Sequence, residues 1–222
     1  MSEMLNLTAS DGHGFGAYLA QPQGTPRGGL VIIQEIFGVN SHIRSVADEY
    51  AADGYLTCCP ALYDRVSPGV ELGYTQDDIT EGLRYKNEVG NEAPLLDIAA
   101  ARDVVASAGK VGVVGYCWGG LVTWLTACGL DGFAAASSYY GGGIGGAKAL
   151  EPKCPVIFHF GDQDHAIPMD EVESVKAAHP NSPVYVYPAG HGFNCEQRES
   201  HHPESRAIAR ERTLSLFRTH VG

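Results

Sequence analysis

The sequence predicts a single α/β domain in which helices cover both faces of a mainly parallel sheet. Short apolar segments alternate with segments of helical periodicity along most of the chain, an order typical of parallel strands joined by helices. Residues 29–33 form a continuously apolar run, as expected of a strand that is buried on both faces. The length of 222 residues suits one domain, and no repeat, low-complexity tract or linker interrupts residues 1–222.

The first predicted elements are a hairpin, a buried strand and a helix. Residues 4–8 and 15–19 flank the typical turn sequence Asp11-Gly12-His13-Gly14. After the strand at 29–33, apolar residues recur at helical spacing from Ile43 to Ala51, and Gly54 is a favourable residue just past that helix. The elements expected next are a strand at 55–59, a loop at 64–75, and helices at 76–89 and 94–108.

The second half contains the most informative unit, a strand at 111–114, a sharp turn at 115–119 and a helix at 121–128. Its continuation keeps the alternation of strand and helix that favours a parallel sheet. The remaining elements expected are strands at 134–139, 156–160 and 184–187, and helices at 170–178 and 204–220.

The composition disfavours several classes of partner. The formal charge of −11 argues against nucleic acid and anionic membranes, because both attract basic patches. No stretch approaches the roughly 18 apolar residues of a membrane span, and no signal peptide is recognisable. The six cysteines show neither C-x-x-C spacing nor a paired framework, so a reducing cytoplasm is the expected location. The sequence leaves the oligomeric state open and is compatible with a monomer.

A cysteine occupies the position of the serine in a known catalytic turn. The turn reads Gly115-Tyr116-Cys117-Trp118-Gly119, which matches G-x-S-x-G with cysteine in place of serine. Such a turn holds its nucleophile in a strained conformation, and the N-terminus of the following helix favours a thiolate. A buried cysteine that only packs is the alternative. The strand before Cys117 and the helix after it favour a nucleophile in an α/β-hydrolase fold.

The acid and base of a catalytic triad are expected after two later strands, because the order in this fold is nucleophile, acid, histidine. Asp162 and Asp164 follow the strand at 156–160, and His191 follows the strand at 184–187. Open α/β sheets place their sites at these carboxyl ends of strands. His191 would take the thiol proton, and the acid would fix its tautomer. Either aspartate could be that acid or could instead bond its own turn.

The loop after the first buried strand carries a further carboxylate, Glu35, at the sheet end that carries Cys117. A solvated loop carboxylate is the simplest alternative for Glu35. The same loop is expected to place the backbone N–H of Ile36 beside that of Trp118. Two such donors would form an oxyanion hole, which stabilises the negative charge that develops on a carbonyl oxygen.

These segments resemble the dienelactone hydrolase family, the carboxymethylenebutenolidases, over nearly the whole chain. The resemblance implies Cys117, Asp164 and His191 as the triad, and so favours Asp164 over Asp162. It also implies that Glu35 holds the resting thiol and swings to accept its proton when substrate arrives. The motifs that carry the resemblance are Gln34-Glu35-Ile36-Phe37-Gly38-Val39-Asn40, Pro60-x-Leu62-Tyr63, Gly115 to Gly120, Tyr139-Tyr140-Gly141, Gly161-x-Gln163-Asp164-His165 and Ala189-Gly190-His191.

One departure from the family pattern concerns the substrate. Dienelactone hydrolases hold the substrate carboxylate with two arginines, and the matching positions here are Glu81 and Cys195. Arg84 or Arg198 could substitute, but solvated surface arginines are an equal alternative. We therefore expect neutral esters or lactones to be hydrolysed at least as well as carboxylate-bearing ones. The candidate substrate-binding residues are Phe37, Arg84, Tyr85, Tyr139 and Arg198.

The sequence as a whole predicts hydrolysis of a small activated ester or lactone through an acyl-enzyme on Cys117. Neither a cofactor nor a metal is expected, because His201-His202 with Cys195 fits no known ligand spacing. Core packing is the simplest reading of Cys58, Cys59, Cys128 and Cys154. The alternatives are a general carboxylesterase or thioesterase, and a redox sensor in which Cys117 is oxidised rather than acylated.

Overall fold

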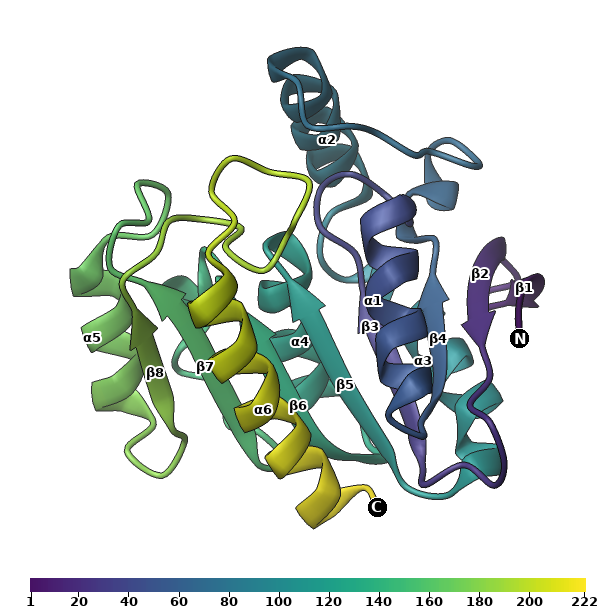
Figure 1. The fold of residues 1–222 in the computed structure, drawn as a ribbon. Coiled ribbons are helices and arrows are strands. Elements are labelled where there is room, and N and C mark those ends of the chain that lie inside the picture. Colours follow the sequence, from purple (N-terminus) through teal and green to yellow (C-terminus); the bar gives the residue numbers. More distant parts are fainter.

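One eight-stranded sheet forms the centre of the computed structural model, which describes residues 1–222 (Figure 1). The predicted hairpin pairs its two strands antiparallel, and its second strand pairs antiparallel with the fourth. All other neighbouring strands are parallel, so the predicted mainly parallel sheet is confirmed. The strands, in sheet order, are β1 (Ser2–Thr8), β2 (Gly14–Ala20), β4 (Leu56–Pro60), β3 (Gly29–Ile33), β5 (Val111–Tyr116), β6 (Phe133–Tyr139), β7 (Val156–Gly161) and β8 (Val184–Tyr187).

Helices cover both faces of the sheet. In Figure 1, α1 and α6 lie in front of the sheet, α3 and α4 lie behind it, and α2 stands above the upper edge. The helices are α1 (Ser41–Ala52), α2 (Gln76–Val89), α3 (Ala93–Val105), α4 (Trp118–Gly129), α5 (Met169–Ala178) and α6 (Pro203–His220). Short 3₁₀ turns are η1 (Leu62–Arg65), η2 (Ala106–Ala108) and η3 (Ile144–Ala147).

Side-chain hydrogen bonds cap the N-termini of two of these helices. The Asn40 side chain accepts a hydrogen bond from the Ile43 N–H at the start of α1. Thr75 and Asp78 form a reciprocal capping box at the start of α2. Such caps satisfy N–H groups that have no partner within the helix. They therefore fix where the loops after β3 and η1 enter their helices.

Several boundaries differ by a few residues from the sequence prediction, among them those around Cys117 and at the end of the third predicted helix. Strand β5 continues to Tyr116, and α4 begins at Trp118 rather than at 121, so Cys117 is the only residue between them. The third predicted helix ends at Val105 and continues as η2 to Ala108. Gly119 and Gly120 weaken the helical signal in the sequence, but they lie inside α4 because its first turn must approach neighbouring strands closely.

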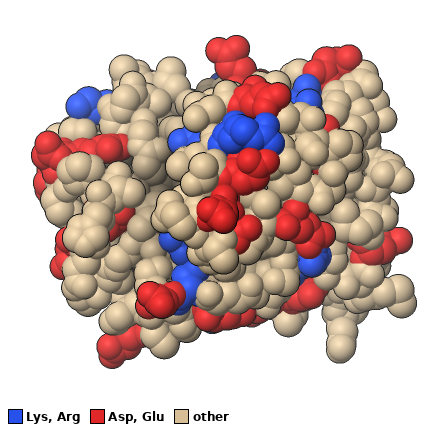
Figure 2. Space-filling model, turned by 90° about the horizontal axis from the view of Figure 1, so that it is seen from above, with Lys and Arg blue, Asp and Glu red and all other residues tan.

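The central strands form the core and direct their carboxyl ends to one edge. Every residue of β3, β5 and β7 is buried. The loops that follow these strands meet at the upper edge in Figure 1, beneath α2. Figure 2 views this edge from above, where acidic side chains are dispersed and most basic ones adjoin them. No helix is long and apolar enough to span a membrane.

Candidate active site

Cys117 lies on a strained turn between β5 and α4. Its backbone has φ 57° and ψ −120°, a conformation that side-chain-bearing residues rarely adopt. The glycines on either side allow this turn to pack closely. A Cβ atom on Gly115 would lie 2.1 Å from the Gly119 carbonyl oxygen, and one on Gly119 would lie 2.4 Å from the Gln34 carbonyl oxygen. The Cys117 N–H donates to the Tyr139 carbonyl oxygen at 3.0 Å, which ties the turn to β6.

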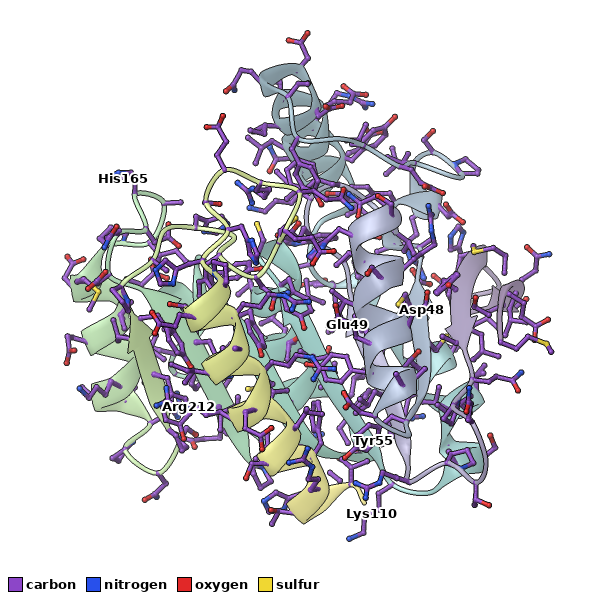
Figure 3. The ribbon with its side chains drawn as sticks, viewed as in Figure 1. Asp48, Glu49, Tyr55, Lys110, His165 and Arg212 are labelled. Carbon is purple, nitrogen blue, oxygen red and sulfur yellow. The ribbon has the colours of Figure 1, made fainter.

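Three side chains from three loops form one chain of hydrogen bonds. Nε2 of His191 lies 3.1 Å from Sγ of Cys117, and Nδ1 of His191 lies 2.7 Å from Oδ2 of Asp164. The other Asp164 oxygen accepts the Ala166 N–H at 2.8 Å, which fixes the carboxylate. The Asp164 side chain is 1% exposed, whereas Asp162 is exposed. His165, labelled in Figure 3, points outward from the β7–α5 loop, away from this group.

The charge on His191 follows from its two partners. Burial by itself lowers the pKa of an imidazole, because it penalises the cation. At His191 the charge of Cys117 and the hydrogen bonds to Asp164 and Cys117 outweigh burial and raise the pKa to about 10. The raised pKa therefore favours a proton on His191 at neutral pH.

Two residues that line the same cleft as Cys117 have backbone amides without partners in the protein. The Ile36 N–H donates no hydrogen bond, and Trp118 is the first residue of α4, where helical N–H groups lack acceptors. Helix α2 packs directly on the Ile36 loop. A Cβ atom on Gly82 would lie 2.2 Å from the Ile36 carbonyl oxygen, so only glycine allows this approach.

A cleft of about 420 Å³ opens beside Cys117. Most of its wall is apolar, and its only charged side chains apart from His191 are Lys86 and Arg198. No aspartate or glutamate lines it, although the whole chain carries a net charge of −11. The lining residues are Ile36, Phe37, Ile79, Leu83, Lys86, Asn91, Cys117, Trp118, Leu121, Gly142, Gly143, Ala166, Ile167, His191 and Arg198.

Comparison with known proteins identifies the family. The family model described as the dienelactone hydrolase family matches residues 15–221. The chain belongs to the dienelactone hydrolase family. A carboxymethylenebutenolidase of Pseudomonas putida is 36% identical over 230 residues, which cover 98% of this chain and 96% of that protein. The reaction class is accordingly the hydrolysis of a carboxylic ester or lactone.

Solved structures support the α/β-hydrolase fold. A crystal structure of a candidate dienelactone hydrolase from Klebsiella pneumoniae matches with a TM-score of 0.84 at 29% identity, covering 99% of this chain and 100% of that one. An esterase of Pyrococcus furiosus matches with a TM-score of 0.72 at 14% identity, covering 100% and 94%. The second likeness concerns the fold alone.

Arg198, one of the predicted substrate-binding residues, lies between the cleft and the buried Glu35. It lines the cleft, and its Nη1 atom lies 3.8 Å from the buried Oε1 of Glu35. Its guanidinium carbon lies 5.8 Å from the ring centres of Phe37 and Tyr74. Gly192 makes room for it, because a Cβ atom there would lie 2.4 Å from Arg198 Nη1. Phe37 also lines the cleft, as predicted for a substrate-binding residue.

Three other residues predicted to bind substrate lie away from the cleft. Arg84 is half-exposed and forms ion pairs with Glu81 at 2.5 Å and with Glu88 at 2.9 Å. Tyr85 packs against Tyr63 and Arg84. Tyr139 has no exposed surface, and its hydroxyl bonds Thr213 at 2.8 Å. These three assignments are corrected, because in each case the side chain is directed to protein partners.

Lys86 is the charged cleft residue that the sequence did not predict. With Ile79 and Leu83 it follows the spacing i, i+4, i+7 on α2, and all three line the cleft. Arg84 belongs to the Glu81 face of the same helix. The sequence left open whether Arg84 or Arg198 takes the place of the family's arginines. Of these two, only Arg198 lines the cleft, and Lys86 lines it as well.

Glu35 is completely buried behind the cleft. Neither of its carboxyl oxygens has a hydrogen-bond partner, so it does not hold the Cys117 thiol in this structure. Burial raises the pKa of Glu35, and the charges of Arg198 and His191 act in the opposite direction. The sulfur is hydrogen-bonded to His191 instead. The arrangement thus differs from the resting one that the resemblance implied.

Proposed function

We propose that this chain hydrolyses a small activated ester or lactone through a thioester on Cys117. The observation that carries the proposal is the continuous chain of contacts from sulfur to His191 at 3.1 Å and from His191 to Asp164 at 2.7 Å. The raised pKa of His191 supports a thiolate–imidazolium pair, which is the reactive form of a cysteine nucleophile.

The first half of the reaction forms the thioester. Sγ of Cys117 attacks the acyl carbon, and the carbonyl electron pair moves to oxygen. The N–H groups of Ile36 and Trp118 are proposed to stabilise that oxyanion. When the adduct collapses, the bond between the acyl carbon and the leaving oxygen breaks. Nε2 of His191 gives its proton to that oxygen, which stays tethered if the substrate is a lactone.

The second half hydrolyses the thioester. Water gives a proton to the now neutral His191 while its oxygen attacks the acyl carbon. The second adduct expels the Cys117 thiolate and releases the carboxylic acid, and the proton on His191 restores the starting pair. Asp164 holds the imidazole tautomer throughout and stabilises its cationic form.

Glu35 is proposed to act as a second acceptor for the thiol proton. Its complete burial, its raised pKa and its position beside Arg198 support a carboxyl group that can change protonation state. Labelling of Cys117 with iodoacetamide at neutral pH tests this role. Slower labelling in Glu35→Gln than in the wild type supports it, because the variant lacks the second proton acceptor. Rapid labelling of both proteins would leave His191 as the sole source of the thiolate.

The proposed substrate carries a carboxylate. Relatives named carboxymethylenebutenolidases are 36% identical to this chain, and the cleft presents Lys86 and Arg198 with no acidic side chain. A carboxylate in a partly enclosed cleft requires charge-assisted hydrogen bonds to replace its hydration, and these two cations are suited to provide them.

Substitution of the nucleophile tests the reaction. Cys117→Ala should abolish turnover of p-nitrophenyl acetate, and a slow ester should add an acyl mass to the peptide that contains Cys117 in the wild type. Asp164→Asn should lose most activity, whereas the matched control Asp162→Asn should keep it, because Asp162 is exposed and unbonded to His191. Full activity in Cys117→Ala would refute the proposal. Reaction with peroxide but not with esters would favour a redox sensor.

A reducing cytoplasm is the proposed location, with no nucleic acid or membrane as partner. All six cysteines are unpaired, and a free Cys117 thiol is needed for the proposed chemistry. Residues of one chain supply the whole proposed triad, so the proposed chemistry needs no second subunit and is compatible with a monomer.

A further inference from the structure

Three side chains that can bind a metal meet behind the cleft. Glu35 follows β3, His42 lies in the first turn of α1, and Cys195 lies in the loop between β8 and α6. Their ligand atoms all lie within 4.8 Å of one another, and all three residues have 0% exposure. The sequence gives no local signal for this cluster, because its members come from three separate segments.

Two members of the cluster have unmet polar atoms. Both ring nitrogens of His42 and both carboxyl oxygens of Glu35 are buried without any hydrogen-bond partner. A neutral imidazole has one donor and one acceptor, so His42 leaves its whole polar capacity unused. Buried polar groups are normally satisfied, and such a concentration of exceptions points to a ligand between them.

We propose that Glu35, His42 and Cys195 form a binding site for Zn²⁺. The ligand atoms are a carboxyl oxygen of Glu35, one ring nitrogen of His42 and Sγ of Cys195, a mixed donor set that zinc accepts. Zinc–ligand bonds of about 2.0–2.3 Å in a tetrahedron separate the ligands by about 3.4–3.8 Å. The observed limit of 4.8 Å needs only small side-chain rotations to contract to that spacing. A thiolate and an imidazole are poor ligands for Mg²⁺ or Ca²⁺.

The charges at the site balance when the metal binds. Zn²⁺ replaces the thiol proton of Cys195, which passes to solvent, and the thiolate and carboxylate together offset the two positive charges. The nearest cations are Arg198, 3.8 Å from Glu35, and Arg206, which is paired with Glu49 and Glu196. Metal binding would withdraw Glu35 from Arg198.

Binding of Co²⁺ tests the site, because a cysteine sulfur bound to Co²⁺ produces a charge-transfer absorption that Zn²⁺ removes by displacement. The measurement is made on Cys117→Ala, which lacks the competing catalytic thiol and is inactive under the proposed function. We expect one equivalent of Co²⁺ with this absorption, and release of protons when Zn²⁺ binds. Because no turnover is involved, failure here is distinguishable from failure of the proposed function.

Variants assign the ligands. Adding Cys195→Ser should remove the charge-transfer absorption, whereas the matched control Cys128→Ser, at a half-buried cysteine elsewhere, should leave it unchanged. Adding His42→Gln should weaken binding by about tenfold or more, as expected for loss of a ligand. If His42→Gln fails to fold, the nearly isosteric Cys195→Ser decides alone. Absorption that survives Cys195→Ser, or that appears only when Cys117 is present, would overturn the site.

Discussion

Arg198 should determine how strongly this enzyme prefers a charged substrate. Arg198→Met removes the guanidinium that lines the cleft but keeps an apolar side chain beside Phe37 and Gly192. One charge-assisted hydrogen bond to a carboxylate contributes about 1.5–3 kcal/mol. Since each 1.36 kcal/mol is a factor of ten, kcat/KM for a carboxylate-bearing lactone should fall by about 10- to 150-fold. The methyl ester of the same lactone should change by less than about threefold.

The structure supplies the control for this experiment. Arg84 lies on the neighbouring helix but is half-exposed and paired with Glu81 and Glu88, so Arg84→Met should leave both substrates unaffected. Equal losses for the acid and the ester in Arg198→Met would show that Arg198 acts through Glu35 or His191 rather than on the substrate. A wild type that hydrolyses the ester at least as well as the acid would restore the expectation drawn from the sequence.

Three further predictions follow from the same geometry. Neutral His191 cannot protonate a leaving oxygen, so kcat/KM for an alkyl ester should fall as pH rises through about 10. The kcat/KM for a p-nitrophenyl ester should fall less, because its leaving group needs no proton. Gly82→Ala should lower kcat about tenfold or more, because its methyl group would displace the Ile36 loop. The control Gly146→Ala, at a glycine with open space around it, should leave kcat unchanged. Equal kcat in both variants would show that the contact between Gly82 and Ile36 does not affect catalysis. Burial lowers the pKa of His42 to about 4 from 6.5, so its stabilising contribution is complete above about pH 6.5 and is lost as pH falls toward 4. Urea unfolding should therefore show about 2 kcal/mol more loss between pH 7 and pH 5 in the wild type than in His42→Gln, and parallel losses would count against a neutral buried His42.

The elements, and the three side chains of the proposed triad, were accessible from sequence because each depends on local order. Apolar runs and helical spacing locate the strands and helices, and the strand–turn–helix context around Cys117 needs only a dozen residues. The position of His191 after β8 follows from the rule that sites form at the carboxyl ends of parallel strands. Asp164 could be chosen over Asp162 only by resemblance, because both belong to one turn and only the packed loop directs Asp164 toward His191.

The substrate-binding residues were less accessible, since they depend on how α2 and the loop after His191 sit above the sheet. Arg84 and Lys86 are two residues apart on α2, and Lys86, which is one turn from Gly82 where α2 contacts the Ile36 loop, is the one that faces the cleft. Spacing from His191 placed Cys195 where the family has an arginine, yet Arg198 reaches the cleft from further along the loop. No local sequence pattern predicts that Arg198 lies in the cleft in place of an arginine at position 195, because the approach of Arg198 depends on the space that Gly192 leaves open.

Glu35 connects the proposed catalytic and metal sites, and its environment explains why a single carboxyl group could serve both. A charged carboxylate without hydrogen bonds is costly to bury, so stability alone would favour an apolar residue at this position. The surrounding groups can each lower that cost, and they do so in mutually exclusive ways. A proton from Cys117 neutralises Glu35, Arg198 pairs with it, and a metal held with His42 and Cys195 would bind it directly. If all three states exist, the occupant of this buried space controls whether Glu35 can take a proton from the nucleophile, and metal binding would then inhibit hydrolysis without entering the cleft.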